Sequence, residues 1–320
     1  MADLPYDVAV VGGGPAGIAA SMWAARYRRK VVLVDAGEQR NRWAEAGHGY
    51  LGMDGATPAS VIALGRAELD RYPEVDVIDG RRVVNACRRG ECFELVLDDG
   101  REIEALRVVL ATGVRDVFPE VPGFERWFGR SIFTCPSCDG YEAQGAKVAV
   151  VGDSEEMAEF AIGLLDWAGS VVAVRESARS SSMNSRARGT LAVDDRRGRV
   201  VAIDADDAVM RGLVLADGTT VPCDVVFWLM RHEQQSDVAR QLGCKISDEG
   251  CVVVGEDCDT TIPHVFAAGD MTPGVHLVQV AAAEGARAGI AAAKSLRGER
   301  GSPMSSPPAP DPEPFVDPSD

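Results

Sequence analysis

Two cysteines separated by two residues, Cys135 and Cys138, are the side chains of this chain with the clearest capacity for chemistry. This spacing allows the two thiols to close a small disulfide, and such pairs often contain an unusually acidic, reactive thiol. In a reducing compartment a pair of this kind is usually catalytic or metal-binding. The pair therefore predicts either thiol–disulfide redox chemistry or half of a metal site.

A zinc site needs a second group of ligands at a matching spacing. Cys87 and Cys92 lie five positions apart and upstream, the four other cysteines stand singly, and the four histidines are scattered. We therefore expect a redox pair and no metal site. The six remaining cysteines are interpreted as small, partly buried residues.

The N-terminal segment carries a glycine pattern typical of dinucleotide-binding folds. A strand-like run leads into Gly12, Gly14 and Gly17, and a helix-like segment follows. The first glycine permits a tight turn, the second lets backbone approach a pyrophosphate, and the third lets helix and strand pack closely. A second strand-like run ends at Asp35, the carboxylate expected to hold a ribose hydroxyl. The pattern predicts a dinucleotide cofactor at the N-terminus of the helix.

The same plan occurs twice along the chain. Val8–Gly12 recurs as Val148–Gly152, and Leu95–Gly100 recurs as Leu213–Gly218. Each Asp-Gly pair lies between strand-like runs, which is typical of a hairpin. Helices that follow strands favour parallel sheets. The sequence predicts an α/β protein with two Rossmann-like, three-layer nucleotide-binding-type domains, the second inserted in the first.

The domain boundaries follow from the positions at which each repeated set of strands and hairpin ends. The run Val265–Asp270 and an alanine-rich helix from about Val278 to Ser295 are expected to return to the first domain. The expected parts are a discontinuous cofactor domain over 1–117 and 246–300, a middle domain with the cysteine pair over 118–245, and a disordered proline-rich acidic tail over 301–320.

Composition limits the partners of the chain. Its formal net charge of −16 makes nucleic acid or an anionic membrane an unfavourable partner. The N-terminus has no basic and apolar leader pattern, and no apolar run reaches the roughly 18 residues of a spanning helix. We expect a cytoplasmic protein that binds neither nucleic acid nor membrane.

Several segments taken in order resemble the thioredoxin-reductase-like flavoproteins, over about residues 5–297. They are the opening glycine motif, Ala111-Thr112-Gly113, Cys135-x-x-Cys138-Asp139-Gly140 and Ala267–Asp270. The resemblance implies FAD as the cofactor and a homodimer. The residues that it places around FAD are Gly12, Gly14, Pro15, Ala16, Gly17, Asp35, Ala111, Thr112, Gly113, Gly269, Asp270 and Gln279. Val278 replaces the arginine of an Arg-Gln pair that is common in the family.

The resemblance also implies roles at the cysteine pair. Cys138 becomes the sulfur on the flavin side, and Cys135 the sulfur that exchanges with substrate. Asp139 matches the acid/base residue of the family. His48 and His276 are candidates to approach the flavin or substrate, although a lone histidine is more often structural.

The middle domain departs from the family pattern where NADPH would bind. Its fingerprint reads Gly152-Asp-Ser-Glu-Glu-Met157, so only the first glycine is kept, and Asp153 and Glu156 have the spacing of a capping box. The next strand ends in Arg175 and Glu176 where basic residues are needed for a 2′-phosphate. The basic residues that remain as replacements are Arg179, Arg186 and Arg188. The sequence favours a chain that works without NADPH.

Within this superfamily the chain resembles most the small-molecule dithiol oxidases of the gliotoxin and holomycin type, which keep FAD and the cysteine pair. The carrying segments are Gly49–Gly55, Cys135–Glu142 and Ala282–Arg287. The resemblance implies oxidation of a small dithiol to a disulfide, with O2 as the acceptor and without NADPH. The alternatives are an NADPH-dependent reductase of a thioredoxin-like protein, a flavin disulfide reductase fed by ferredoxin or another protein donor, and a non-catalytic FAD redox sensor.

Overall fold

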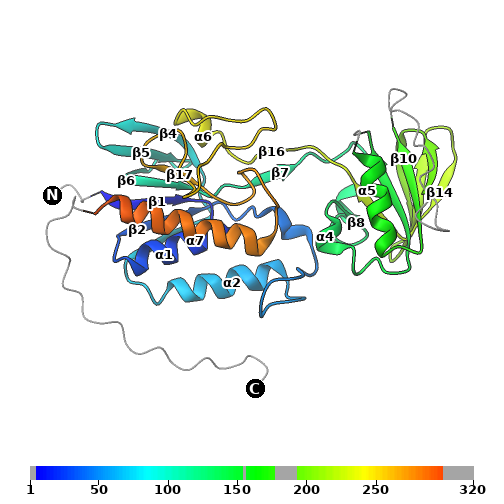
Figure 1. Cartoon of the computed structure of the whole chain (residues 1–320), viewed down its shortest axis with the longest axis horizontal. Coiled ribbons are helices and arrows are strands. Elements are labelled where there is room, and N and C mark those ends of the chain that lie inside the picture. The colour runs from blue at the N-terminus through cyan, green and yellow to red at the C-terminus, as the bar shows by residue number, and fades with distance from the viewer. Residues whose placement is uncertain (1–4, 154–155, 177–192, 298–320) are drawn as a thin grey trace, which may run out of the picture. The chain divides into compact units, whose positions relative to one another are not determined.

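The computed structural model describes residues 5–153, 156–176 and 193–297. The chain divides by its internal contacts into two compact units (Figure 1). Unit 1 contains the described residues up to Glu38, Ile62–Gly113 and the described residues from Gln234 onwards; unit 2 contains Gln39–Val61 and Val114–Glu233. Most of unit 2 is thus one insertion into unit 1. The expected tail over 301–320 lies outside the described residues.

Unit 1 is built on a mainly parallel sheet with the strand order β3-β2-β1-β6-β5-β4, in which β17 also pairs with β6. Its strands are β1 (Tyr6–Val11), β2 (Val31–Asp35), β3 (Val75–Asp79), β4 (Val83–Arg89), β5 (Cys92–Leu97), β6 (Glu102–Leu110) and β17 (Val265–Ala267). Its helices are α1 (Pro15–Arg26), α2 (Pro58–Leu69), which begins within the last residues of Gln39–Val61, α6 (Val238–Gln241) and α7 (Val278–Ser295). The parallel pairing of β17 with β6 confirms that the C-terminal strand returns to the first sheet.

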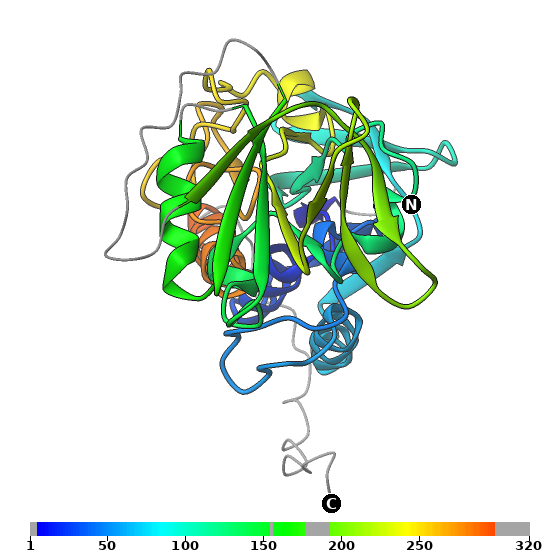
Figure 2. The ribbon, with the colours of Figure 1, turned by 90° about the vertical axis from the view of Figure 1, so that its right-hand side faces the viewer.

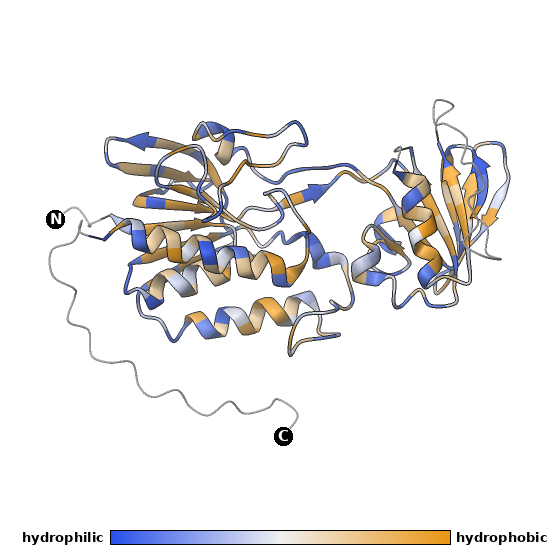
Figure 3. Ribbon diagram, viewed as in Figure 1, coloured by the Kyte–Doolittle hydropathy of each residue, from blue (hydrophilic) through white to orange (hydrophobic). Residues whose placement is uncertain are grey.

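The central strands of unit 1 are buried on both faces, which explains their uninterrupted apolar sequence. Val8 and Val10 face a core formed with α1 and α7, whereas Ala9 and Val11 face a second core that includes Val238 and Ala239 of α6 and Val252. Figure 3 shows the resulting hydrophobic colour along these strands. The sheet is therefore the middle of three layers.

Helix α7 covers the sheet together with α1, and its bounds agree with the predicted helix over Val278–Ser295. The two helices touch at glycines. A Cβ atom on Gly285 would lie 2.0 Å from the carbonyl oxygen of Ala16, and one on Gly289 would lie 2.3 Å from that of Ala20. Any side chain at these positions would therefore push α7 away from α1.

Unit 2 repeats the plan with a five-stranded parallel sheet in the order β11-β10-β9-β15-β8 and a separate antiparallel sheet in the order β12-β13-β14, counted over its described residues. Its strands are β8 (Ile132–Phe133), β9 (Lys147–Gly152), β10 (Ser170–Arg175), β11 (Val193–Arg197), β12 (Val200–Ala205), β13 (Met210–Leu215), β14 (Thr220–Pro222) and β15 (Val225–Trp228). Its helical segments are η1 (Arg40–Trp43), α3 (Phe124–Trp127), α4 (Pro136–Asp139), α5 (Met157–Gly163) and η2 (Leu164–Asp166). The strands β7 (Val114–Asp116) and β16 (His232–Gln234) pair where the chain enters and leaves this insertion.

The parallel sheet of unit 2 is also covered on both faces. Val148 and Val150 pack toward α5, and Ala149 and Val151 pack toward the antiparallel strands (Figure 2). The predicted hairpin at Leu213–Gly218 is confirmed, because β13 and β14 pair in antiparallel fashion across it. Both copies of the plan therefore fold into the α/β architecture that the repeat predicted.

The contact division differs from the sequence-based boundaries in the segment Gln39–Val61, which packs with unit 2. Trp43 lies against Phe118 with ring centroids 5.7 Å apart, and Arg40 forms two hydrogen bonds with the carboxylate of Asp116. At the other boundary, Gln241 of α6 accepts a hydrogen bond from the amide of Ala86 in β4, so α6 packs with unit 1. These contacts join residues far apart in sequence, and no local motif marks them.

No helix within the described ranges is long and apolar enough to cross a membrane. The longest, α7, is 18 residues long and carries charged side chains such as Glu284, Arg287 and Lys294.

We predict that Gly289→Ala destabilises the protein by roughly 2–3 kcal/mol, because the added methyl group collides with backbone that cannot rotate away. Gly163→Ala in α5 is the matched control, since a Cβ there meets nothing within 4 Å. The control should be neutral or stabilising by about 0.5–1 kcal/mol, as expected for Gly→Ala in a helix. Urea unfolding measures both, and equal midpoints for Gly289→Ala and wild type would contradict the packing argument.

Candidate active site

The predicted redox pair lies on a short helical turn of unit 2. Cys135 and Cys138 form a disulfide with their Cα atoms 5.3 Å apart, and the amide of Cys138 donates a hydrogen bond to Sγ of Cys135. Pro136 begins the turn, where its missing N–H is not needed. A Cβ on Gly140 would lie 3.0 Å from the ring of Trp167, so the turn is packed closely against η2. No group of three or more potential metal ligands lies within the described ranges.

Asp139 follows the disulfide and is half-buried. Burial and, to a smaller extent, the nearby carboxylate of Glu142 raise the pKa of this carboxyl to about 6, and His48 opposes the shift. Asp139 therefore changes its charge close to neutral pH, as a group that moves protons during thiol exchange must do.

The predicted cofactor residues of unit 1 gather at one edge of its sheet. β1, β6 and β17 are neighbouring parallel strands, so their carboxyl ends meet there. Gly12 follows β1, Ala111–Gly113 follow β6, and Gly269 follows β17 closely. The fold brings together three segments that lie far apart in the sequence.

The glycine turn after β1 has the geometry that its pattern predicted. Gly12 has a φ of +106°, and a Cβ there would lie 2.2 Å from the carbonyl oxygen of Ala111. A Cβ on Gly17 would lie 1.7 Å from the carbonyl oxygen of Gly12. Gly14, in contrast, faces open space, and as N-cap of α1 it offers no side chain to the helix amides. The turn fits a pyrophosphate at the N-terminus of α1, which begins with Pro15.

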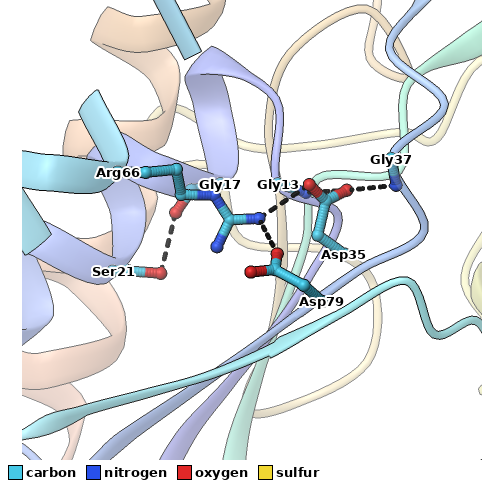
Figure 4. A network of polar contacts seen from close by, with 7 residues as sticks. All are labelled: Gly13, Gly17, Ser21, Asp35, Gly37, Arg66 and Asp79. Carbon is cyan, nitrogen blue, oxygen red and sulfur yellow. Dashed lines mark hydrogen bonds and ion pairs between the residues drawn. The ribbon is translucent and has the colours of Figure 1, made fainter. Parts of the chain in front are cut away.

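Asp35 ends β2 beside this turn, as predicted, and its carboxylate is part of a polar network (Figure 4). Its oxygens accept hydrogen bonds from the amides of Gly13 and Gly37 at 3.1 and 3.0 Å. Nη2 of Arg66 donates to Asp35 at 2.7 Å and to Asp79 at 2.8 Å. The carboxylate is therefore held rigidly at the position where a ribose hydroxyl is expected.

Two residues at this edge were not assigned from the sequence. Arg66 of α2 lies beside Asp35, and its Nη1 is a buried donor for which the described residues supply no acceptor. Glu284 of α7 accepts hydrogen bonds from the amide of Gly269 and the hydroxyl of Thr272. The open face of the glycine turn and the orphaned donor of Arg66 both fit a nucleotide cofactor. Arg66 belongs to no motif, and although Glu284 lies in the segment Ala282–Arg287 that carries the resemblance, the sequence assigned it no role; the fold identifies both.

The other predicted cofactor residues lie close to the same edge in unit 1. Ala16 is in the first turn of α1, and a Cβ on Gly269 would lie 3.0 Å from its Cβ. Thr112 donates a hydrogen bond from its hydroxyl to Sδ of Met271. Asp270 follows Gly269, and Gln279 is exposed in the first turn of α7. Their roles toward FAD stay predictions.

The corresponding edge of unit 2 is built differently. Gly152 pairs with Arg175 across β9 and β10, so Arg175 occupies the position that Asp35 has in unit 1. Arg175 is 1% exposed, and its guanidinium forms a two-point ion pair with Asp195 of β11. A Cβ on Gly152 would lie 2.8 Å from Leu229, which shows that this glycine serves packing. Arg175 is thus engaged within the protein.

Acidic side chains stand beside this pair. Burial raises the pKa of Glu176 and Asp153 contributes to the rise, whereas a hydrogen bond from the amide of Val200 and the charge of Arg199 oppose it. Helix α5 begins only at Met157, and the side chain of Glu156 makes no capping bond, so the capping box predicted at Asp153 and Glu156 is wrong. The replacement arginines at 179, 186 and 188 lie outside the described residues.

Comparison with known proteins decides the family. The family description "Pyridine nucleotide-disulphide oxidoreductase" matches residues 6–285. The chain belongs to this family. The resemblance to thioredoxin-reductase-like flavoproteins is thereby confirmed, and FAD is the cofactor of these proteins.

Three relatives illustrate the similarity. Thioredoxin reductase tcpT of Claviceps purpurea is 34% identical over 147 residues, which are 45% of this chain and 46% of that protein. Thioredoxin reductase aclD of Aspergillus oryzae is 28% identical over 311 residues, which are 92% of this chain and 98% of that protein. The crystal structure of HlmI is similar with a TM-score of 0.85 and 32% identity, covering 91% of this chain and 92% of that chain. The match with tcpT thus spans less than half of that relative, whereas the other two matches are nearly complete.

We predict that Gly14→Val weakens FAD binding by roughly 10- to 100-fold, because its side chain enters the open face of the turn. The fold of the flavin-free protein should persist, since a Cβ at Gly14 meets nothing within 4 Å. Gly17→Ala is the contrast, because its methyl group collides with Gly12 and should destabilise the turn itself. Flavin titration and thermal unfolding of the flavin-free variants separate the two effects; unchanged FAD affinity in Gly14→Val would contradict the assignment.

Proposed function

We propose that the protein is an FAD-dependent dithiol oxidase that converts a small-molecule dithiol to a disulfide with O2 as acceptor and without NADPH. The observation that carries the proposal is the edge of unit 2 that corresponds to the glycine-turn edge of unit 1. Arg175, which ends β10, is buried in an ion pair with Asp195, and the carboxyl groups of Asp153 and Glu176 lie at the same edge. A pyrophosphate and a 2′-phosphate would meet acidic groups there.

The exchange reaction is assigned to the disulfide of unit 2. A substrate thiolate attacks Sγ of Cys135, the Cys135–Cys138 bond breaks, and Cys138 leaves as a thiolate. The second substrate thiolate then attacks the substrate sulfur of this mixed disulfide, which closes the product and releases Cys135. The amide of Cys138, which donates to Sγ of Cys135, stabilises the negative charge that forms on that sulfur.

Bound FAD supplies the two-electron acceptor that allows the reduced pair to become a disulfide again. In the net reaction one dithiol loses two hydrogen atoms, and one dioxygen becomes hydrogen peroxide. Asp139, ionised above pH 6, accepts a proton from the incoming thiol. By the resemblance to the thioredoxin-reductase-like flavoproteins, we propose a homodimer; the cytoplasmic location stays a prediction from the sequence.

A second candidate is an NADPH-dependent reductase of a thioredoxin-like protein. The names of the relatives tcpT and aclD favour it, since both are called thioredoxin reductases. It requires that the edge of unit 2 accept a nicotinamide dinucleotide despite its acidic groups.

We predict that neither NADPH nor NADH bleaches the flavin of the anaerobic protein, whereas a dithiol bleaches it rapidly and air restores it. Absorbance near 450 nm, a general flavin property, follows the change. Cys135→Ser should lose dithiol-dependent bleaching by at least about 1000-fold, because no disulfide remains to be attacked. Cys92→Ser, at a free cysteine distant in sequence, is the control and should behave as wild type. Fast stoichiometric bleaching by NADPH would establish the reductase instead.

We also predict that kcat/KM for the dithiol rises with pH and that the midpoint of this rise lies near pH 6. The raised pKa means that Asp139 becomes protonated as the pH falls through about 6, so the base is lost below this value. Asp139→Asn should lower kcat/KM at pH 7 by roughly 100-fold or more and move the limb toward the pKa of the thiol, about 8.5 for a cysteine-like thiol. An unchanged limb in the variant would exclude Asp139 as the base.

A further inference from the structure

The segment Gln39–Val61 places a histidine beside the redox turn within unit 2. Its residues 47–56 form a small closed loop, in which the amide of Gly47 donates to the carbonyl of Ala56 at 2.8 Å. His48 belongs to this loop, and its Nδ1 lies 3.5 Å from Oε1 of Glu142. Glu142 follows Asp139 by three residues. The loop is thus linked to the chain just after the Cys135–Cys138 turn by a contact between two side chains that lie far apart in the sequence.

Two carboxylates lie within 4.0 Å of this imidazole. Oδ1 of Asp54 lies 4.0 Å from Nδ1 of His48 and also accepts a hydrogen bond from the amide of Gly49. The side chain of His48 is 28% exposed, that of Glu142 39% and that of Asp54 76%. Solvent therefore screens Asp54 most strongly, and the pair with Glu142 dominates. When protonated, His48 supplies a positive charge beside these two carboxylates.

Within the described residues, two charged side chains act on the carboxyl group of Asp139. Glu142 and His48 are the charges that perturb its carboxyl, in opposite directions. Without His48, the charge of Glu142 would act on Asp139 without compensation, and Asp139 would hold its proton to a higher pH. A base that holds its proton cannot accept another from an incoming thiol.

We propose that His48 is a positioning residue for thiol exchange: by pairing with Glu142 it neutralises the second carboxylate beside Asp139 and keeps Asp139 ionised at neutral pH. This inference rests on the proposed function, because it assigns Asp139 the role of proton acceptor. It revises the interpretation of His48 as a lone histidine. The partner that makes it functional, Glu142, was not visible in the spacing of the sequence.

A purely structural role for the pair would be to hold the loop in place. The same segment offers a comparison, because Glu45 pairs with Arg130 at 3.0 Å and both side chains are more than half exposed. Glu45→Gln breaks a second ion pair of the segment without changing a charge that acts on Asp139. It is therefore the matched control for a loss of tethering.

The experiment measures anaerobic bleaching of the flavin by dithiothreitol against pH in the holoprotein, which is independent of O2. His48→Gln should move the rising limb to higher pH, and Glu142→Gln should move it to lower pH, each by about 0.5–1 pH unit. Glu45→Gln should leave the limb in place. Thermal unfolding of each variant reports loss of fold separately.

Opposite shifts of the pH limb in the two variants would support the proposal. If the His48–Glu142 pair only held the loop in place, removing either side chain would have the same effect on the limb. Limbs that stay in place, or that move in the same direction, would overturn it while the oxidase assignment stands. If wild type is not bleached by dithiothreitol at any pH, the proposed function and this inference both fail. Should His48→Gln not fold, the shift in Glu142→Gln still decides the matter.

Discussion

The architecture of unit 1 depends on a close approach of backbone to backbone around the start of α1. The helix touches the turn after β1 at Gly17 and Gly12, and it touches α7 where Gly285 meets Ala16. These contacts leave no space for side chains, so they hold α1 close to the turn and to α7. Gly14 differs from its neighbours in the turn because a Cβ there would meet nothing within 4 Å. The binding geometry thus follows from packing.

The second copy of the plan shows how the same framework serves another purpose. The strand order and the two buried faces are kept, but the strand-end position of Asp35 is taken by Arg175, which is turned into an ion pair with Asp195. In unit 1 the edge leaves backbone amides for a ligand, whereas in unit 2 its charges are satisfied by the protein. The second unit also carries the Cys135–Cys138 disulfide and the half-buried carboxylate of Asp139.

Local signals predicted much of this structure. The glycine turn, the hairpins and helix α7 depend on residues within a few positions of one another, and all were correctly predicted. Contacts across long sequence separations were missed: the placement of Gln39–Val61 with unit 2, Arg66 beside Asp35, and the pair of His48 with Glu142. The capping box failed because α5 begins at Met157, after the residues whose spacing had suggested it.

The ion pair of Arg175 also bears on the evolutionary history open to the chain. To offer this guanidinium to a charged ligand the chain would have to release it from Asp195, and removing one partner of a nearly buried pair costs on the order of 3 kcal/mol. That is a large fraction of the stability of an ordinary domain. Variants that break the pair would therefore lose stability before any new contact at this strand end could form. The pair thus restricts which ligands this edge of unit 2 could acquire by single substitutions.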